Sequence, residues 1–287
     1  MKVGKSNRDS IADNPFLSPL LMIHTPPEYL LWSGKLPVEK VPTVAIIGTR
    51  RPTAYGKEVT RQLATELAQQ GVIIVSGLAL GIDAIAHEAA LEAGGVTVAV
   101  LPTGLPEIYP ATHRQLAQRI IRQGGALISE YPPGTLARKH HFLARNRLIS
   151  GLADAIVVTE AADRSGTLST VGHALEQNKD VFAVPGPITS LLSVGPNRLL
   201  QQGAHVVMSA TDILHVIAPE RVVEQLTIPL AQTPIEQVII DLIRSGVRDG
   251  DELLHTSGVE ASEFLQAMTM MELRNVVKPM GGNRWQV

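Results

Sequence analysis

Short apolar runs without polar alternation recur along most of the chain, and segments with helical spacing separate them. The runs cover residues 43–49, 72–75, 96–101, 126–129, 155–159 and 181–184, with a last short one at 205–208. A run of this kind is typical of a strand that is covered on both faces, as in a parallel sheet. Apolar residues recur at helical spacing between them, in 54–70, 81–93, 113–122, 165–176 and 197–202. This alternation predicts βαβ units and a doubly wound, mostly parallel α/β sheet.

The distribution of proline and of charge divides the chain into four parts. Residues 1–42 hold six prolines around short apolar pieces and predict an N-terminal arm or truncated subdomain that packs through Trp32. Residues 43–218 form the sheet domain, and residues 219–233 form a linker. Residues 234–287 predict three helices (235–245, 251–256 and 260–273) and a hairpin (276–280 with 284–287), the pattern of a small winged-helix domain.

The stretch 138–170 has the features of an anion site. We expect a basic loop, the start of a helix, a buried strand at 155–159, and a turn of small residues that opens another helix at Ser165, Gly166 and Thr167. A helix N-terminus offers free backbone N–H groups and the positive end of its dipole. The upstream segment carries Arg138, Lys139, Arg145 and Arg147, and no carboxylate lies between residues 131 and 153. The alternative is an ordinary helix cap beside a solvated basic surface.

Two further turns follow strands of the predicted sheet and end at the same rim. They are residues 48–51 (GTRR) and 76–77 (SG), and ligands of such sheets bind beyond the carboxyl ends of the strands. Neither turn matches the GxGxxG pattern, so we expect no dinucleotide cofactor. Gly77 and Gly81 equally fit a role in permitting tight turns. Asn146, between two arginines, offers donors and acceptors for a sugar or base edge.

Composition limits the classes of partner. A formal charge of −2 excludes a globally basic nucleic-acid coat, so a polyanion must bind a local patch. The absence of cysteine excludes disulfides, thiolate nucleophiles and cysteine zinc sites, and we expect no metal. Aromatic residues make up 3% of the chain, which draws attention to Phe142 within the basic stretch. We find no apolar leader and no apolar span of about 18 residues, and expect a soluble, cytoplasmic protein without a membrane partner.

Several motifs, in this order, resemble those of the DNA-processing protein A family, called DprA or Smf. They are GTRRPTAYG, SGLALGIDAIAHEAALEAGGVTVAVLPTGL, IYP, SEYPPG, FLARNRLISGLADAIVVTEAADRSGTLSTVGHALE and VPGPI. The resemblance runs from about Pro26 to Ile217, and the C-terminal module matches the small winged-helix domain of the family. It implies an extended Rossmann-like domain that binds single-stranded DNA, forms a homodimer, and loads the RecA recombinase in natural transformation.

The resemblance also implies which residues contact DNA. The turn after the first sheet strand falls on Gly48, Thr49 and Arg50, and the K-x-x-F element falls on Lys139 and Phe142. The RNR element falls on Arg145, Asn146 and Arg147, and the SGT helix start on Ser165, Gly166 and Thr167. Two departures stand out: the N-terminal arm is too short for the helical domain that family members commonly carry, and Leu143 replaces a usual proline.

The main alternative is an enzyme that acts on a nucleotide or nucleotide sugar in the same pocket. The family is similar to phosphoribohydrolases with a GGxGTxxE motif, whose catalytic Glu falls here on Thr170, so the acid/base group is missing. His87, Asp83 and Glu130 are the other conceivable acid/base groups, although a histidine such as His87 more often packs or caps. We therefore expect no catalytic residues.

A third hypothesis, which complements DNA binding, is a scaffold that docks the recombinase. Dimerisation could use the apolar surface around Leu191, Leu192 and Leu199 or the acidic C-terminal module, and the sequence does not choose between them; these leucines could also simply pack in the core. From residue 235 onward the C-terminal module carries eight acidic and five basic residues. We expect it to dock protein and not to enter a major groove, because acidic side chains would meet the phosphates.

Overall fold

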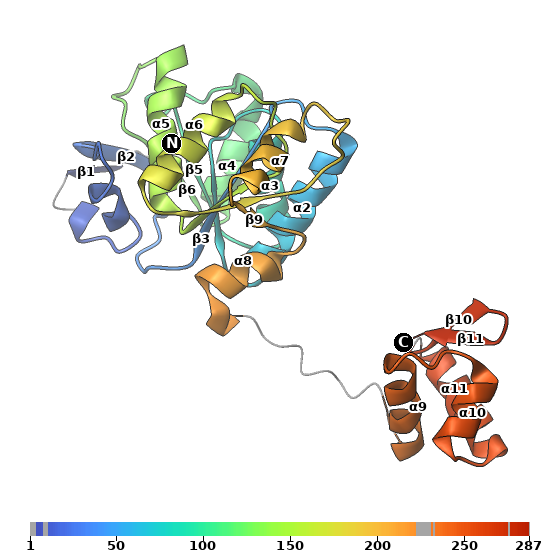
Figure 1. The fold of residues 1–287 in the computed structure, drawn as a ribbon. Coiled ribbons are helices and arrows are strands. Elements are labelled where there is room, and N and C mark those ends of the chain that lie inside the picture. The colour runs from blue at the N-terminus through green and yellow to red at the C-terminus, as the bar shows by residue number, and fades with distance from the viewer. Residues whose placement is uncertain (1–3, 8–10, 222–230, 232, 275, 287) are drawn as a thin grey trace. The chain divides into compact units, whose positions relative to one another are not determined.

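The computed structural model describes residues 4–7, 11–221, 231, 233–274 and 276–286 (Figure 1). The chain divides into two units, Met1–Val222 and Val223–Val287. The predicted linker, residues 219–233, lies mostly outside the described residues; its first three form a 3-10 helix, η3 (Pro219–Arg221).

Nine strands within the described part of the first unit form one sheet, in the order β1-β2-β6-β5-β4-β3-β7-β8-β9. The strands from β3 to β9 pair in parallel, whereas β1 and β2 are antiparallel to their neighbours. The predicted mostly parallel α/β sheet is therefore confirmed. The strands are β1 (Gly4–Asn7), β2 (Tyr29–Gly34), β3 (Thr43–Ile47), β4 (Ile73–Ser76), β5 (Thr97–Val100), β6 (Ala126–Ser129), β7 (Ala155–Val158), β8 (Asp180–Ala183) and β9 (His205–Val206).

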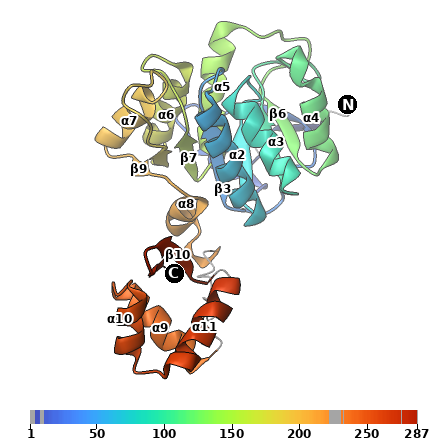
Figure 2. The ribbon, with the colours of Figure 1, turned by 90° about the vertical axis from the view of Figure 1, so that its right-hand side faces the viewer.

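Helices cover both faces of the sheet, as the unbroken apolar strands require (Figures 1 and 2). One face packs against α2 (Ala54–Gln69), α3 (Ile82–Glu92), α4 (Arg114–Arg122) and α8 (Ala210–Ile217). The other packs against α5 (Lys139–Leu152), α6 (Gly166–Glu176) and α7 (Val194–Gln201). Short 3-10 helices, η1 (Ser18–Leu21) and η2 (Ala111–His113), complete the unit.

The N-terminal segment, expected to be an arm or truncated subdomain that packs through Trp32, is part of the sheet and of its core, and Trp32 packs against that core. Strand β2 pairs with β6, and Phe16, Leu17 and Leu20 are fully buried in the cluster that contains α5. Trp32 itself is only partly buried. The pairing of β2 with β6 joins segments about a hundred residues apart, which a local pattern of residues does not reveal.

The order of the sheet reverses at β3, which lies between β4 and β7. The connections on the two sides of this switch point lead away in opposite directions, and a crevice is left beyond the carboxyl ends of β3 and β7. The turn after β3 and the loop from β7 to α6 therefore end beside each other.

The second unit consists of three helices followed by a two-stranded hairpin. These are α9 (Pro234–Arg244), α10 (Gly250–Ser257), α11 (Ala261–Leu273), β10 (Lys278–Gly281) and β11 (Arg284–Gln286). The side chains of Thr233 and Asp249 cap α9 and α10, and Phe264 and Met271 lie in a common core with the isoleucines of α9. Its assignment as a winged helix stays a prediction.

Candidate functional site

A cavity of about 510 Å³ opens at the switch point of the sheet, between α5, the turn after β3 and the start of α6. Ten of the eleven residues proposed to contact DNA line this cavity, and Arg147 is the exception. The ten are Gly48, Thr49, Arg50, Lys139, Phe142, Arg145, Asn146, Ser165, Gly166 and Thr167. Residues that are 119 positions apart in the sequence thus surround one space.

The turn after β3 is fixed by backbone hydrogen bonds on both sides. The N–H of Thr49 donates to the carbonyl of Glu160 (2.7 Å), and the carbonyl of Thr49 accepts from the N–H of Ile82 (3.2 Å). A Cβ at Gly48 would lie 2.6 Å from the side chain of Ile82, so this position needs glycine for packing. The turn leaves Arg50 exposed, with its guanidinium carbon 5.2 Å from the ring centroid of Phe142.

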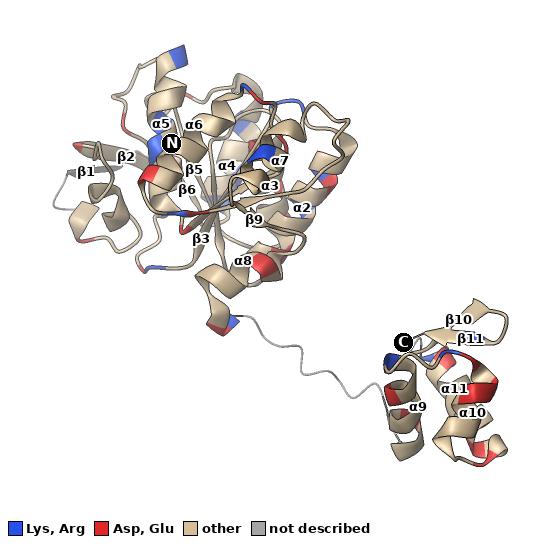
Figure 3. Cartoon of the chain, in the orientation of Figure 1, with Lys and Arg blue, Asp and Glu red and all other residues tan. Residues whose placement is uncertain are grey.

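Helix α5 carries most of the cationic and aromatic lining. It begins at Lys139, so Lys139, expected in a basic loop, stands in the first helical turn, and Arg138 is the N-cap residue. Lys139, Phe142 and Asn146 are spaced three and four residues apart, which places them on one face of the helix, toward the cavity. Figure 3 shows basic positions at the beginning of α5. Within the described residues, neither Arg50 nor Lys139 has a carboxylate partner.

The start of α6 forms the opposite wall. Thr167 Oγ1 donates to the carbonyl of Gly48 (3.1 Å), and Asn146 Nδ2 donates to the carbonyl of Gly166 (3.3 Å), so both flanking elements are tied to this helix. Apart from Gly166 itself, its two chain neighbours and the backbone of its own helix, no atom of the described residues lies within 4 Å of the position that a Cβ of Gly166 would occupy. The hydroxyl of Ser165, the N-cap residue, is a buried oxygen without a hydrogen-bond partner. Because the space at Gly166 is open, a hydrogen-bond acceptor such as a phosphate oxygen can come close to the positive end of the helix dipole.

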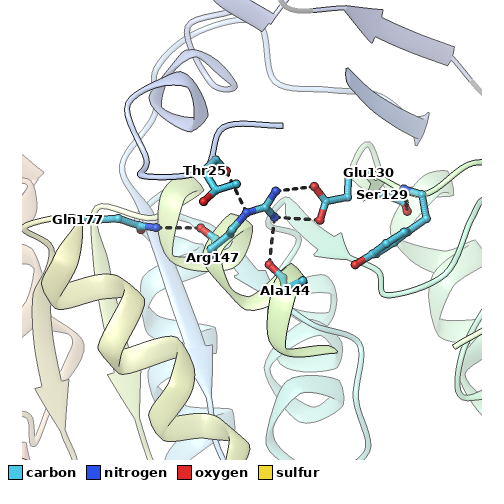
Figure 4. Close-up of polar contacts among 7 residues, drawn as sticks. Thr25, Ser129, Glu130, Ala144, Arg147 and Gln177 are labelled. Carbon is cyan, nitrogen blue, oxygen red and sulfur yellow. Dashed lines mark hydrogen bonds and ion pairs between the residues drawn. The ribbon is translucent and has the colours of Figure 1, made fainter. Parts of the chain in front are cut away.

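Arg147, which the sequence also predicts to contact DNA, does not line the cavity. Its guanidinium group forms two hydrogen bonds with the carboxylate of Glu130 (2.9 and 2.6 Å) and donates to the carbonyls of Thr25 and Ala144 (Figure 4). Glu130 follows β6 directly and lies just outside the carboxylate-free stretch that the sequence displays. Arg147 thus joins α5 to β6 and to the N-terminal segment, and its charge is neutralised.

Arg145 lies at the cavity, as expected, but its side chain has partners within the protein. Its side chain borders the cavity, but the residue is 3% exposed and donates from Nη1 to the carbonyls of Gly77 and Val100. Burial lowers the pKa of Arg145 to about 10, an effect that nearby Asp83 opposes, so it stays charged at neutral pH. The guanidinium group of Arg145 consequently occupies the space beside Gly77, so the turn at residues 76–77 is not open to a phosphate.

The acid/base groups considered for an enzyme are engaged in the fold. His87 is fully buried, and its Nδ1 lies 2.6 Å from Thr97 Oγ1; burial, with His113 and Arg145 nearby, lowers the pKa of His87 to about 3. Asp83 lines the cavity but accepts from the backbone N–H groups of Gly77 and Ala79. Burial raises the pKa of Asp83, and Arg145 and these N–H groups oppose the rise. Thr170, the position of the hydrolase glutamate, lines the cavity and has no carboxylate.

Sequence reasoning missed Tyr109, whose ring meets that of Phe142 edge to face with centroids 5.5 Å apart. Tyr109 is 45% exposed at the cavity and offers a second aromatic surface. The motif IYP contains it, but nothing in the neighbouring sequence indicates that this loop reaches α5. The hydrophobic residue Leu143 is a further lining residue that was not predicted to be part of the site.

Neither a candidate metal cluster nor a membrane-spanning helix is found among the residues that the structure describes. These residues contain no group of three or more His, Asp or Glu side chains arranged to hold a metal ion. In the same part of the chain, every helix is too short or too polar to cross a bilayer.

Comparisons with known proteins give the same picture as the motifs. The model of the DNA recombination-mediator protein A family matches residues 10–218. DNA processing protein DprA of Bacillus subtilis is 43% identical over 206 residues, which cover 71% of this chain and 69% of that protein. The solved structure of DprA from Streptococcus pneumoniae superposes with a TM-score of 0.70 at 39% identity, over 76% of this chain and 75% of that one.

DNA processing protein A of Helicobacter pylori, whose structure was described for its unique mode of binding single-stranded DNA, is also similar. It superposes with a TM-score of 0.66 at 32% identity, over 77% of this chain and 97% of that one. The match to the family model covers well over half of the present sequence and includes every residue around the cavity. The chain belongs to the DNA recombination-mediator protein A family.

Proposed function

We propose that the chain binds single-stranded DNA without catalysing a reaction on it, and that the cavity at the switch point receives the strand. The observation that carries this proposal is the convergence of Arg50, Lys139 and the start of α6 on one cavity. Two exposed cations that have no carboxylate partner in the described part of the chain attract a polyanion, and the helix N-terminus adds backbone donors. The similarity to the H. pylori protein supports the same choice of ligand.

Each wall of the cavity has its own part in this proposal. Arg50 and Lys139 neutralise successive phosphates, and residues 165–167 donate hydrogen bonds to a phosphate oxygen. Phe142 and Tyr109 contact bases through their rings, an interaction that every base can make. Binding therefore depends little on sequence.

The absence of catalysis is supported by the state of the groups that an enzyme would need. Thr170 stands where a hydrolase has its glutamate, and His87 lies buried outside the cavity. Glu130 is held by Arg147, and the carboxylate of Asp83 by two backbone N–H groups. Release of a free base from a nucleoside monophosphate by the purified chain would instead support the phosphoribohydrolase-like alternative.

We extend the proposal to the remaining roles that the motifs imply: loading of RecA onto incoming strands in natural transformation, in the cytoplasm, as a homodimer. For dimerisation, Leu191 is 81% exposed, whereas Leu199 is buried in the core. We expect Leu191→Glu to convert a dimer into a monomer in light scattering, and Met22→Glu, at another exposed apolar residue, to leave it unchanged. A monomeric wild-type chain would refute the homodimer.

The binding proposal is tested by fluorescence anisotropy with labelled oligo-dT and with a duplex of equal length, over a range of salt concentrations. We expect preference for the single strand. Arg50→Ala and Lys139→Ala should each weaken binding on the order of tenfold and reduce the salt slope by about 0.7, the value of one phosphate contact on a single strand. Arg122→Ala removes an exposed arginine outside the cavity and serves as the control. Unchanged affinity of both cavity variants would refute the site.

A further inference from the structure

Helix α5 supplies six of the residues that line the cavity, so its placement on the sheet decides the geometry of the site. Lys139, Phe142 and Asn146 all project from it. A shift or rotation of α5 would move all three relative to the start of α6. The contacts that hold α5 against the rim of the sheet are therefore as important as the side chains that reach into the cavity.

Arg145 makes such contacts from the middle of α5. Its Nη1 donates to the carbonyl of Gly77, in the turn after β4 (2.8 Å), and to the carbonyl of Val100, at the end of β5. A Cβ at Gly77 would lie only 2.2 Å from Nη1, so the guanidinium group occupies the space that a side chain there would fill. One buried cation thus joins the helix to the ends of two neighbouring strands.

Asp83 holds the same turn from the opposite side. It lies in the first turn of α3, is 7% exposed, and accepts from the N–H groups of Gly77 (3.1 Å) and Ala79 (3.3 Å). Between these two residues, Leu78 adopts a left-handed conformation with φ of 56°, which is strained for a non-glycine residue. The turn is therefore held in an unfavourable conformation between an anion and a cation that are both buried.

We propose that Arg145 and Asp83 form a buried clamp on the turn after β4, and that this clamp positions α5 for nucleic-acid binding without contacting the phosphates. The inference rests on the proposed function of the cavity. It assigns Arg145 a role opposite to that of Lys139, although both are cations of one helix. Removal of a phosphate contact flattens the salt dependence of binding, whereas loss of a positioning residue lowers affinity at every salt concentration.

The test compares Arg145→Met, Asp83→Asn, the double variant, Arg145→Lys and the control Arg122→Met in the full chain. Affinity for labelled oligo-dT is measured across salt, and thermal unfolding of the first unit is followed by Trp32 fluorescence in a Trp285→Phe background. Arg145→Met leaves Asp83 buried without its cation, so we expect the Tm to fall on the order of 10 °C. The Kd should rise about tenfold, with the salt slope unchanged.

The other variants separate a clamp from a phosphate contact. Adding Asp83→Asn to Arg145→Met removes the unpaired anion and should recover part of the Tm, but not the affinity, because the hydrogen bonds from Arg145 to Gly77 and Val100 are still missing. The ammonium of Arg145→Lys can donate to both carbonyls and should keep the Kd within about threefold of wild type. A salt slope that falls by about 0.7 in Arg145→Met, a double variant whose Tm is no higher than that of Arg145→Met, or a double variant that binds oligo-dT as tightly as wild type would overturn the proposal.

If Arg145→Met does not fold, the double variant decides: a folded protein with the wild-type salt slope supports the clamp, and an unfolded one refutes it. Failure of the proposed function has a different signature. A wild-type chain that does not bind oligo-dT would refute DNA binding, whereas the Tm values of the same variants would still show whether the clamp exists.

Discussion

At the scale of single residues, the surroundings of each cation in and beside the cavity determine what it can do. Arg50 and Lys139 are exposed and lack carboxylate partners within the described residues. Arg147 is held by Glu130, and Arg145 by two backbone carbonyls. Only the first pair can exchange its hydration shell for a phosphate without losing an existing partner.

The ion pair between Arg147 and Glu130 gives a prediction about stability. Both side chains are largely buried, so Glu130→Gln leaves the guanidinium group incompletely paired. We expect the free energy of unfolding to fall by about 2 kcal/mol, between the values for surface and for fully buried pairs. Urea unfolding measures this, and oligo-dT binding should keep its salt slope. Equal stability of the variant and wild type would show that the pair is not formed in solution.

His87 gives a prediction about pH. In the unfolded chain it takes up a proton below its ordinary pKa of 6.5, whereas in the folded chain its pKa is lowered to about 3. The unfolded state therefore binds the additional proton, and stability falls as the pH drops from 6.5 toward 3, by up to about 1.4 kcal/mol per pH unit. His87→Asn should remove this part of the slope, because asparagine can still donate to Thr97.

The measurement is chemical unfolding at several pH values, followed by Trp32 fluorescence in a Trp285→Phe background. His24→Asn changes an exposed histidine and should retain the wild-type profile. Parallel profiles for His87→Asn and wild type would show that His87 is protonated in the folded protein as readily as in the unfolded one.

At the scale of elements, the site is made by two helices that start at the same rim. Helix α5 supplies Lys139, Phe142 and Asn146, and α6 supplies its N-terminus. Hydrogen bonds from Thr167 to Gly48 and from Asn146 to Gly166 connect these helices with each other and with the turn after β3. The cavity therefore depends on the packing of α5 and α6, and through it on the N-terminal segment.

We predict that Phe16 contributes strongly to the stability of this face. It is 1% exposed and lies in the same cluster as Leu148, Ile149 and Leu152 of α5. Phe16→Ala should lower the free energy of unfolding by about 3–5 kcal/mol, the cost of a cavity in a packed core. Met22→Ala, at a side chain that is 88% exposed in the same segment, should cost less than about 0.5 kcal/mol. A small effect of Phe16→Ala would mean that the segment is not docked.

The elements also show which parts could be predicted from the sequence. Unalternated apolar runs identified β3 to β8 within a residue or two, because strands buried on both faces carry the signal locally. Strand β2 was missed because its partner, β6, is remote in the sequence. The ten cavity residues were predicted from a family resemblance and from turns at strand ends. The directions of two side chains could not be predicted in this way: Arg145 points to Gly77 and Arg147 to Glu130, and no local sequence pattern connects either pair.

At the scale of the whole molecule, the chain has a sheet unit that carries the cavity and a second unit with more acidic than basic residues. All residues around the cavity belong to the first unit. From residue 235 onward the second unit has eight acidic and five basic residues, and three glutamates lie in or next to α11. This charge disfavours contact with phosphates.

We therefore predict that a chain ending at Val222 binds oligo-dT with a Kd within about threefold of the full chain, because no cavity residue is removed. Anisotropy with the same oligonucleotide provides the comparison. Circular dichroism of the shortened chain controls for folding. A loss of affinity well beyond tenfold in a folded, shortened chain would assign DNA contacts to the second unit.

The position of the bound strand tests the account most directly. Photocrosslinking of the full chain to oligo-dT that contains 5-iodouracil, followed by mass spectrometry of the peptides, identifies aromatic residues that touch bases. The account predicts adducts on Phe142 or Tyr109, and their reduction by Lys139→Ala. Adducts concentrated in the second unit, or on the sheet face covered by α2 and α3, would contradict it.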